Sequence, residues 1–480
     1  SRIWLYKTLD DAKTAAALTS GQPSHITDNR YIESLIDDNW YVPSNLGSIQ
    51  AAIDAASSGD TINVAAGIYT EALYIDKELT LTGAGRDITT IQAPTVLPSY
   101  AWNSGVNSLV AIDTTTVDIS GFKIDGLHKG DGGDQFVGVH FWKSSGSIKD
   151  SKITGFRDST LGGDQDGFGI LVNHEWDVSF TQQVTIEGNT IDDYQKGGIV
   201  VTEIDSNATI KSNIVTGQGP TGDGQIAQNG IQIGYGANGT IESNTVTAHD
   251  YTPASWSASG ILLTGTDGVV IRLNNVNNNE VGISLSEDED YEYGGANNSE
   301  IALNNLNSNQ IAIQVEGGTD GNADNNIYLN NISGNTSKGL DNTSVNSVDA
   351  TENWWGDISG PTHATLNPNG TGDEISDDVT FEPWYLDEGN TNLSDTIDSI
   401  FDDVSDNLAS QGVESNIGDV TASNFTSFSD LYFEKSIDSE KIGRLTFTAA
   451  LDLSSEATQA FLQNLGDYME ANAGSMKFDA

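Results

Sequence analysis

Acidic side chains recur in the short turns of residues 131–260, directly before strands that begin with Gly-Val or Gly-Ile. Paired carboxylates can do general acid–base work on a glycosidic substrate. These turns therefore support one hypothesis, a site that acts on polysaccharides. The candidate catalytic residues are His140, Asp166, Asp192, Asp193 and Lys196.

Aromatic residues accompany the acidic turns. The strand alternation that turns Val139 inward turns His140 and Trp142 outward, near the same edge. Rings that face solvent beside carboxylates can stack on the faces of sugars. The candidate glycan-binding residues are Trp142, Phe168, Tyr194 and Trp256.

The same turns could hold calcium, because crowded carboxylates can share a hard cation through their oxygens. We expect no organic cofactor. The alternative is that Asp and Gly occupy these turns for backbone reasons alone. The candidate calcium ligands are Asp131, Asp134, Asp164 and Asp166.

One phrase returns along residues 119–355: an isoleucine, two variable residues, an asparagine, and a second aliphatic residue two positions later. Its asparagines are Asn189, Asn213, Asn244, Asn274, Asn304, Asn330 and Asn353. Successive asparagines are 24, 31, 30, 30, 26 and 23 residues apart, so the period varies while the phrase stays fixed. This pattern predicts stacked coils whose turns absorb insertions and whose asparagine amides hydrogen-bond from coil to coil.

A second phrase, Gly-Val or Gly-Ile, lies between the asparagines. Each repeat therefore holds two or three short strands of period 2, separated by turns rich in Gly, Asn and Asp. No run of helical period interrupts them. The pattern predicts an all-β fold, a parallel β-helix of about 10 coils.

A solenoid needs caps at both ends. Residues 48–57 predict a short amphipathic helix with Ser48 as its N-cap and Ile49, Ala52, Ile53 and Ala56 on one face. Near the other end, tryptophans and chain breakers gather at 354–361 and 381–384. We expect these two segments to close the coil stack.

Residues 48–71 (Ser-Ile-Gln-Ala-Ala-Ile through Ile-Tyr-Thr-Glu) and 77–85 (Lys-Glu-Leu-Thr-Leu-Thr-Gly-Ala-Gly) resemble the opening of pectin-lyase-like right-handed β-helix proteins. Residues 353–361 (Asn-Trp-Trp-Gly-Asp-Ile-Ser-Gly-Pro), with Pro383-Trp384, resemble the closing motif of β-helix regions in large bacterial and archaeal surface proteins. The resemblance implies a right-handed parallel β-helix. It implies no single activity, because this fold carries lyases, hydrolases, esterases, epimerases and adhesive modules.

The catalytic motifs of the enzymes with this fold are not matched as a set. Gln165-Asp166-Gly167 is similar to one aspartate motif of the pectinesterase-like members, and Asp192-Asp193 is similar to the acidic pair of the polygalacturonase-like members. Their companion motifs are absent from the sequence.

The flanks of the repeat differ from it in composition. Residues 1–47 form an aromatic N-terminal segment, or the end of a preceding module. Residues 48–386 form the β-helix. Residues 387–480 predict a small α+β module, with helical spacing at 393–408, strands at 431–435 and 443–448, and a helix at 455–465.

Composition restricts the partners. The chain has 480 residues with 20 basic and 69 acidic side chains, a net charge of −49, and no cysteine. Such a surface repels phosphate, so nucleic acids are poor partners, and no apolar run is long enough to span a bilayer. The first methionine is Met469, so we expect either a removed signal peptide or a segment of a longer protein.

These features together favour an extracellular or cell-surface prokaryotic protein. Our leading hypothesis is a structural or surface-assembly module, of the S-layer, filament or adhesin type, built on a rigid calcium-stabilised rod. Its partners would be copies of itself or neighbouring surface modules. The alternatives are a lyase, hydrolase or epimerase that acts on an acidic glycan, and a non-catalytic glycan-binding protein.

Overall fold

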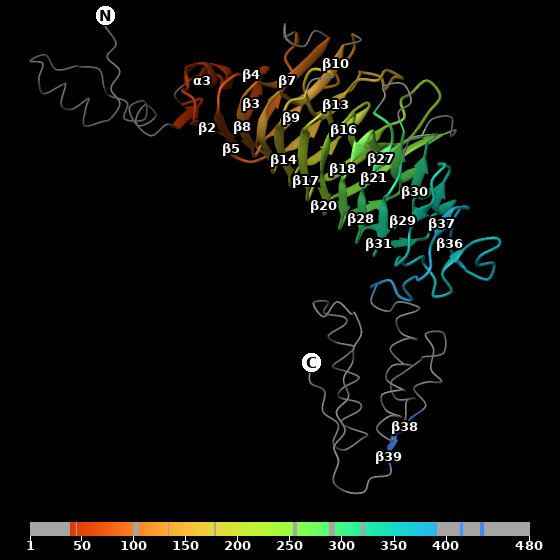
Figure 1. Cartoon of the computed structure of the whole chain (residues 1–480). Helices are drawn as coiled ribbons and strands as arrows, with labels where there is room; N and C mark the ends of the chain where they lie inside the picture. The colour runs from red at the N-terminus through yellow and green to blue at the C-terminus, as the bar shows by residue number, and fades with distance from the viewer. Residues whose placement is uncertain are drawn as a thin grey trace, which may run out of the picture.

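The computed structural model describes residues 39–44, 46–98, 105–132, 134–176, 179–252, 257–287, 293–317 and 322–390, together with two short strands at 413–415 and 433–435. Between residues 39 and 390 the described chain winds into stacked coils, whose strands build three long parallel sheets (Figure 1). The predicted all-β parallel β-helix is therefore confirmed.

The first sheet carries the isoleucines of the repeated asparagine phrase, with Ile148, Ile186 and Ile210 opposite one another. Its 13 strands, in sheet order, are β1 (Asn39–Val42), β2 (Asp60–Val64), β5 (Leu79–Gly83), β8 (Thr116–Ser120), β11 (Ser145–Lys149), β14 (Gln182–Glu187), β17 (Ser206–Lys211), β20 (Asn238–Glu242), β24 (Val270–Arg272), β28 (Glu300–Ala302), β31 (Asn326–Tyr328), β34 (Val348–Asp349) and β37 (Val379–Thr380).

The second sheet follows the asparagine of each phrase, so the asparagines lie at the turn between the first and second sheets. Its 10 strands are β3 (Gly67–Thr70), β6 (Thr89–Gln92), β9 (Lys123–Asp125), β12 (Lys152–Thr154), β15 (Thr190–Asp192), β18 (Ile214–Gly222), β21 (Thr245–Thr252), β25 (Asn275–Asn277), β29 (Asn305–Asn307) and β32 (Asn331–Ser333).

The third sheet contains the Gly-Val and Gly-Ile phrase. Its 10 strands are β4 (Leu73–Ile75), β7 (Val106–Asp113), β10 (Gln135–Trp142), β13 (Phe168–Asn173), β16 (Gly197–Thr202), β19 (Asn229–Gly234), β22 (Ser259–Thr264), β26 (Val281–Ser286), β30 (Ile311–Glu316) and β33 (Lys338–Asn342).

The glycine of this phrase marks an irregularity in each strand. Val137 lies opposite Phe168 and Val139 opposite Ile170, while Gly138 between them takes no place in the register. A Cβ atom on Gly138 would lie 2.4 Å from the carbonyl oxygen of Gly169, so only glycine fits. The irregularity turns Val139 into the core and leaves Val137 in a separate apolar cluster.

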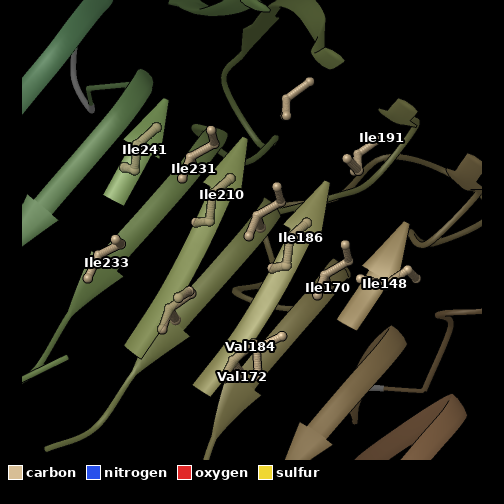
Figure 2. Packing of buried hydrophobic residues seen from close by; sticks show 14 of the residues in the cluster. Ile148, Ile170, Val172, Val184, Ile186, Ile191, Ile210, Ile231, Ile233 and Ile241 are labelled. Carbon is tan, nitrogen blue, oxygen red and sulfur yellow. The ribbon is translucent and has the colours of Figure 1, made fainter. Parts of the chain in front are cut away.

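Columns of aliphatic side chains fill the interior of the coil. Figure 2 shows Ile148, Ile186, Ile210 and Ile241 along neighbouring strands of the first sheet, with Ile231 of the third sheet among them. All five are fully buried. Each such side chain contributes about 2 to 3 kcal/mol of hydrophobic stabilisation, so the repeated isoleucine drives the coils to stack.

The N-terminal end of the stack is closed by α3 (Ile49–Ala55), as predicted. The Ser48 hydroxyl accepts a hydrogen bond from the Ala51 backbone N–H at 3.2 Å. The carboxylate of Glu71 accepts two more from the N–H groups of Ile49 and Gln50, at 3.0 and 2.9 Å. The predicted apolar face, which includes Ile49, Ala52, Ile53 and Ala56, is buried.

The other end of the stack is closed by residues 350–385, in which Trp355 is fully buried. This segment holds the parallel pair of β35 (Pro361–Thr362) and β36 (Gly372–Glu374). Asp373 accepts hydrogen bonds from the backbone N–H groups of Gly334 and Asn335, both at 3.0 Å, and so ties the closing segment to the last full coil.

The β-helix begins before the predicted boundary at residue 48, and only two short strands are described beyond its C-terminal end. Strand β1 lies within the predicted N-terminal segment but pairs in parallel with β2, so the first sheet already begins at Asn39. Within the predicted C-terminal module, β38 (Val413–Ser415) pairs antiparallel with β39 (Phe433–Lys435). The helices predicted at 393–408 and 455–465 and the strand at 443–448 lie outside the described residues.

Candidate functional site

The seven repeated asparagines stack at the turn between the first and second sheets, and all are buried. The side-chain N–H of each donates to the Oδ1 atom of the next, at 3.0 to 3.1 Å from Asn189 through to Asn353. The backbone N–H of each donates to the same Oδ1 atom at 2.9 to 3.0 Å. This ladder fixes the coil-to-coil spacing and holds the turns on the outside of the rod in register.

A second polar column crosses the turn between the second and third sheets, five residues after the ladder. Its members are Tyr194, His249, Asn279, Asn309 and Asn335. The Tyr194 hydroxyl lies 2.5 Å from the His249 Nε2 atom, and Asn279 Nδ2 donates to Asn309 Oδ1 at 3.0 Å. The column ends on the carboxylate of Asp373, which accepts from Asn335 Nδ2 at 2.6 Å. The sequence signal was the asparagine that recurs five residues after Asn274, Asn304 and Asn330.

Asp158, Asp164 and Asp166 lie in the turn between the second and third sheets, where all three contact the side chain of Gln195. We call this turn region the carboxylate edge. The Gln195 amide donates to Asp166 Oδ1 at 2.7 Å, to Asp158 Oδ2 at 3.2 Å and to the Asp164 carbonyl oxygen at 3.3 Å. Burial raises the pKa of Asp166 to about 6, and the negative charges of Asp158 and Asp164 add to the shift. Asp166 is therefore the candidate acid with a proton to exchange near neutral pH.

Asp193 is held in an ion-pair cluster. Its carboxylate accepts from Arg157 Nε at 2.6 Å and Gln218 Nε2 at 2.9 Å, and lies 2.5 Å from the His128 Nε2 atom. Burial would raise the pKa of Asp193, but these hydrogen bonds together lower it. Asp193 is thus ionised and engaged by partners.

Two further candidates are engaged as well. Asp192 forms an ion pair with Lys152 at 3.0 Å. Lys196 Nζ donates to the Ala227 carbonyl oxygen at 3.0 Å, and burial lowers the pKa of its ammonium to about 8. Asp166 and Lys196 share one turn region, whereas Asp192 projects from the second sheet.

His140 was expected to face solvent, and this expectation is wrong. It does lie on the outer face of the third sheet, because Val139 and Phe141 occupy the core. Its ring is nevertheless fully buried, with Nδ1 3.1 Å from the Ser108 hydroxyl and Nε2 2.7 Å from Asn173 Oδ1. Burial lowers the pKa of His140 to about 4, which suits a neutral structural group.

The expected exposed aromatics are also buried. Tyr194 lies in the core, and Trp142 and Phe168 are 7% and 8% exposed, too little for a sugar to stack on. The sequence could not predict this, because strand alternation does not tell whether an outer face is covered. Trp256 lies outside the described residues.

The four expected calcium ligands do not converge. Asp131 accepts from the Ser159 hydroxyl at 3.1 Å, and Asp134 from Asn107 Nδ2 at 3.2 Å, while Asp164 and Asp166 belong to the carboxylate edge. Within the described ranges, no group of three or more His, Asp or Glu side chains is arranged to hold a metal ion. Calcium binding stays a prediction, which melting temperatures with calcium and with EDTA would test.

A groove of about 610 Å³ crosses the other edge of the rod, between the third and first sheets. Its floor is formed by the starts of β17 and β20 and by the parallel pair of β23 (Thr266–Asp267) and β27 (Ala296–Asn297). We call it the aromatic groove. The polar side chains that line it are Thr181, Gln183, Asp205, Ser206, Asn207, Asn238, Thr266, Asp267, Tyr293 and Asn297.

One aromatic ring, that of Tyr293, lines this groove, and the rings of Trp176 and Tyr235 pack against it. The Tyr293 ring centroid lies 5.4 Å from that of Trp176 and 6.0 Å from that of Tyr235, and the latter two are 5.6 Å apart. Tyr293 fits because a Cβ atom on Gly265, where φ is +59°, would lie 2.5 Å from the Tyr293 Cβ. Trp176 is 43% exposed, so its ring offers an accessible apolar face.

His174 ties the turns that carry Trp176 and Asp205. Its ring nitrogens lie 2.9 Å from the carbonyl oxygens of Glu175 and Ile204, and the ring is buried. The groove is therefore built on braced turns, with amide and carboxylate groups beside rings that pack edge to face or tilted. Such a surface can bind hydroxyl-rich ligands that have an apolar face.

Sequence analysis missed this groove, because its residues come from turns of differing length on several coils. The usable signal was a tyrosine or aspartate beside glycine in successive turns, as in Tyr235-Gly236, Asp267-Gly268 and Tyr293-Gly294.

Residues 168–354 match the family model of the right handed beta helix region. The observed parallel β-helix is therefore right-handed, as the sequence resemblance implied. No curated protein sequence matches this chain.

Several solved structures are similar to the chain. The Dettilon tailspike protein is 16% identical, with a TM-score of 0.46 over 72% of this chain and 69% of its own. The A-module of the mannuronan C-5 epimerase AlgE4 of Azotobacter vinelandii is 17% identical, with a TM-score of 0.40 over 61% and 86%. A periplasmic alginate epimerase, AlgG, is 15% identical, with a TM-score of 0.38 over 67% and 76%.

In the described part of the chain, no helix has the length and apolar character needed to cross a membrane.

Proposed function

We propose that this chain is an extracellular surface module, a rigid β-helix rod that presents a glycan-binding site in the aromatic groove. The observation that carries the proposal is the cluster of Trp176, Tyr235 and Tyr293 beside the amides and carboxylates of the groove. Aromatic faces stack on the C–H face of a sugar, and amides and carboxylates satisfy its hydroxyl groups.

The rod supports this role because it holds the groove rigidly. The turns that form the groove are anchored to strands of the first and third sheets, and the asparagine ladder ties these coils to one another. A site on braced turns loses little conformational entropy when a ligand binds. Extended polysaccharides suit a groove that crosses successive coils.

The test compares glycan binding by the native chain and by Trp176→Ala on an array of immobilised polysaccharides. We expect the affinity of the variant to fall by about tenfold or more, because a ligand ring that stacks on an aromatic side chain gains about 1 to 3 kcal/mol of binding free energy. Tyr41→Ala is the matched control, since Tyr41 is 45% exposed, close to the 43% of Trp176, but lies at the N-terminal end of the rod. Equal binding by Trp176→Ala and the native chain would contradict the proposal.

Polysaccharide cleavage or epimerisation is the second candidate, and the raised pKa of Asp166 is the observation that favours it. A carboxyl group with a pKa of about 6 can act as a general acid near neutral pH. Incubation of the chain with alginate and with polygalacturonate tests this role. Activity that is lost in Asp166→Asn but kept in Asp131→Asn would support it, and no turnover of either polymer would exclude it for these substrates.

A further inference from the structure

We infer that the aromatic groove selects uncharged oligosaccharides and rejects polymers of uronic acids. This inference rests on the proposed function, that the groove binds glycans, and adds the class of glycan. Three features carry it: the charges that line the groove, the ion pairs that already engage the nearby lysine and arginine side chains, and the capacity of the groove carboxylates to accept hydrogen bonds.

The charges of the groove have one sign. Asp205 and Asp267 both line it and are both exposed. Among its described lining residues there is no lysine, arginine or histidine. A uronate carboxylate in this groove would therefore meet like charges, and the rest of the chain adds to the repulsion through its net charge of −49.

Cations on the adjoining strands and turns are already paired with acids. Lys211, at the end of β17, forms an ion pair with Glu187 at 3.0 Å. Arg272, at the end of β24, pairs with Glu242 at 2.6 Å. Lys143, which precedes the first sheet in its coil, pairs with Glu175. A uronate would have to displace one of these acids before it gained a cationic partner.

The groove carboxylates instead keep capacity to accept hydrogen bonds. Asp205 Oδ2 accepts from the Ser179 hydroxyl, and Asp267 Oδ1 accepts from Asn298 Nδ2 at 2.6 Å. The second oxygen of each carboxylate has no partner among the described residues, and neither has the side-chain amide of Asn207. Charge-assisted bonds from sugar hydroxyls to such oxygens are about twice as strong as neutral ones.

The aromatic rings complete the selection. The C–H face of a hexose can pack on Trp176 or Tyr293, while its hydroxyl groups donate to Asp205 and Asp267. A ring in which a carboxylate replaces the exocyclic hydroxymethyl group loses one donor and gains a repelled charge. The groove is thus complementary to hydroxyl donors and opposed to anions.

The test measures binding by calorimetry with two sets of hexasaccharides. The neutral set is made from gluco-, manno- and galacto-oligosaccharides, and the acidic set from oligomannuronate and oligogalacturonate. At about 0.01 M salt we expect at least one neutral ligand to bind about tenfold or more tightly than either acidic ligand. The difference should shrink at about 1 M salt, where the charges are screened.

The double variant Asp205→Asn, Asp267→Asn keeps the shape of the groove and removes both charges. It should weaken neutral binding by about tenfold, because charge-assisted bonds become neutral ones, and should improve acidic binding. If the acidic set bound more tightly than the neutral set, and this binding were lost in Trp176→Ala, the proposed selectivity for uncharged oligosaccharides would be wrong. The proposed function would then still stand. Binding in neither set, or binding that Trp176→Ala leaves unchanged, would contradict the proposed function itself.

Discussion

Asp166 combines burial with two acidic neighbours, and these raise its pKa to about 6. In the unfolded chain the same carboxyl group has a pKa of about 3.9. The folded state therefore binds this proton more tightly than the unfolded state does. The stability contributed by this tighter binding is complete below about pH 4 and is lost as the pH rises through 6.

Asp166→Asn should remove this dependence, because the amide keeps an oxygen for the Gln195 donor without the charge. At pH 8 we expect the variant to be more stable than the native chain by about 2 to 3 kcal/mol, and at pH 4 to differ little. Urea denaturation at both pH values measures the difference. If the free energy of unfolding of the two proteins changed with pH in the same way, the pKa of Asp166 would not be raised in the folded chain.

At the same scale, the sequence predicted which face of the sheet a side chain occupies but not whether that face is covered. Val139 and His140 lie on opposite faces, as the alternation indicates, yet both are fully buried. The burial of His140 depends on Ser108 and Asn173, which come from neighbouring strands more than thirty residues away in the sequence. Such contacts follow from the coil register, which no local pattern contains.

At the scale of elements, each rung of the asparagine ladder satisfies groups on two neighbouring coils. Asn274 Nδ2 donates to the Ile241 carbonyl oxygen at 2.8 Å and to Asn304 Oδ1 at 3.0 Å. Its own Oδ1 atom accepts from the backbone and side-chain N–H groups of Asn244. Removing one interior rung therefore leaves several buried polar groups without partners.

Asn274→Ala should lower the free energy of unfolding by about 2 to 4 kcal/mol, because each buried unsatisfied group costs about 1 to 3 kcal/mol. Asn275→Ala is the matched control: this neighbour is half-buried on the outer face, and its loss should cost less than about 1 kcal/mol. Thermal and urea unfolding measure both variants. A similar cost for the two would show that the ladder adds nothing beyond an ordinary turn asparagine.

The ladder could be predicted because its residue type is constant, whereas the second polar column changes type from Tyr194 through His249 to Asn335. In the intervening coil, a Cβ atom added to Gly217 would lie 2.9 Å from the His249 Cδ2 atom, so glycine leaves the histidine ring free of a clash. The tyrosine ring can therefore reach the histidine two coils away. Variation in turn length of this kind also concealed the aromatic groove.

At the scale of the whole molecule, two buried histidines set a limit on stability in acid. Burial lowers the pKa of both His140 and His249 to about 4. The unfolded chain binds these protons at about pH 6.5, so stability falls as the pH drops from 6.5 to 4. Four carboxyl groups whose pKa is raised by burial, Asp166, Glu280, Glu316 and Asp373, act in the opposite direction.

The protonation of these two histidines should therefore cost the native chain a few kcal/mol of stability between pH 7 and pH 4. Proton NMR of the native chain offers the direct test, because it reports each of the 6 histidines without a substitution. Two imidazole signals should remain neutral until about pH 4 or until unfolding. The paired variant His140→Gln, His249→Gln should show a flatter melting profile between pH 6.5 and 4, and titration of all histidine signals near 6.5 in the folded state would contradict the argument.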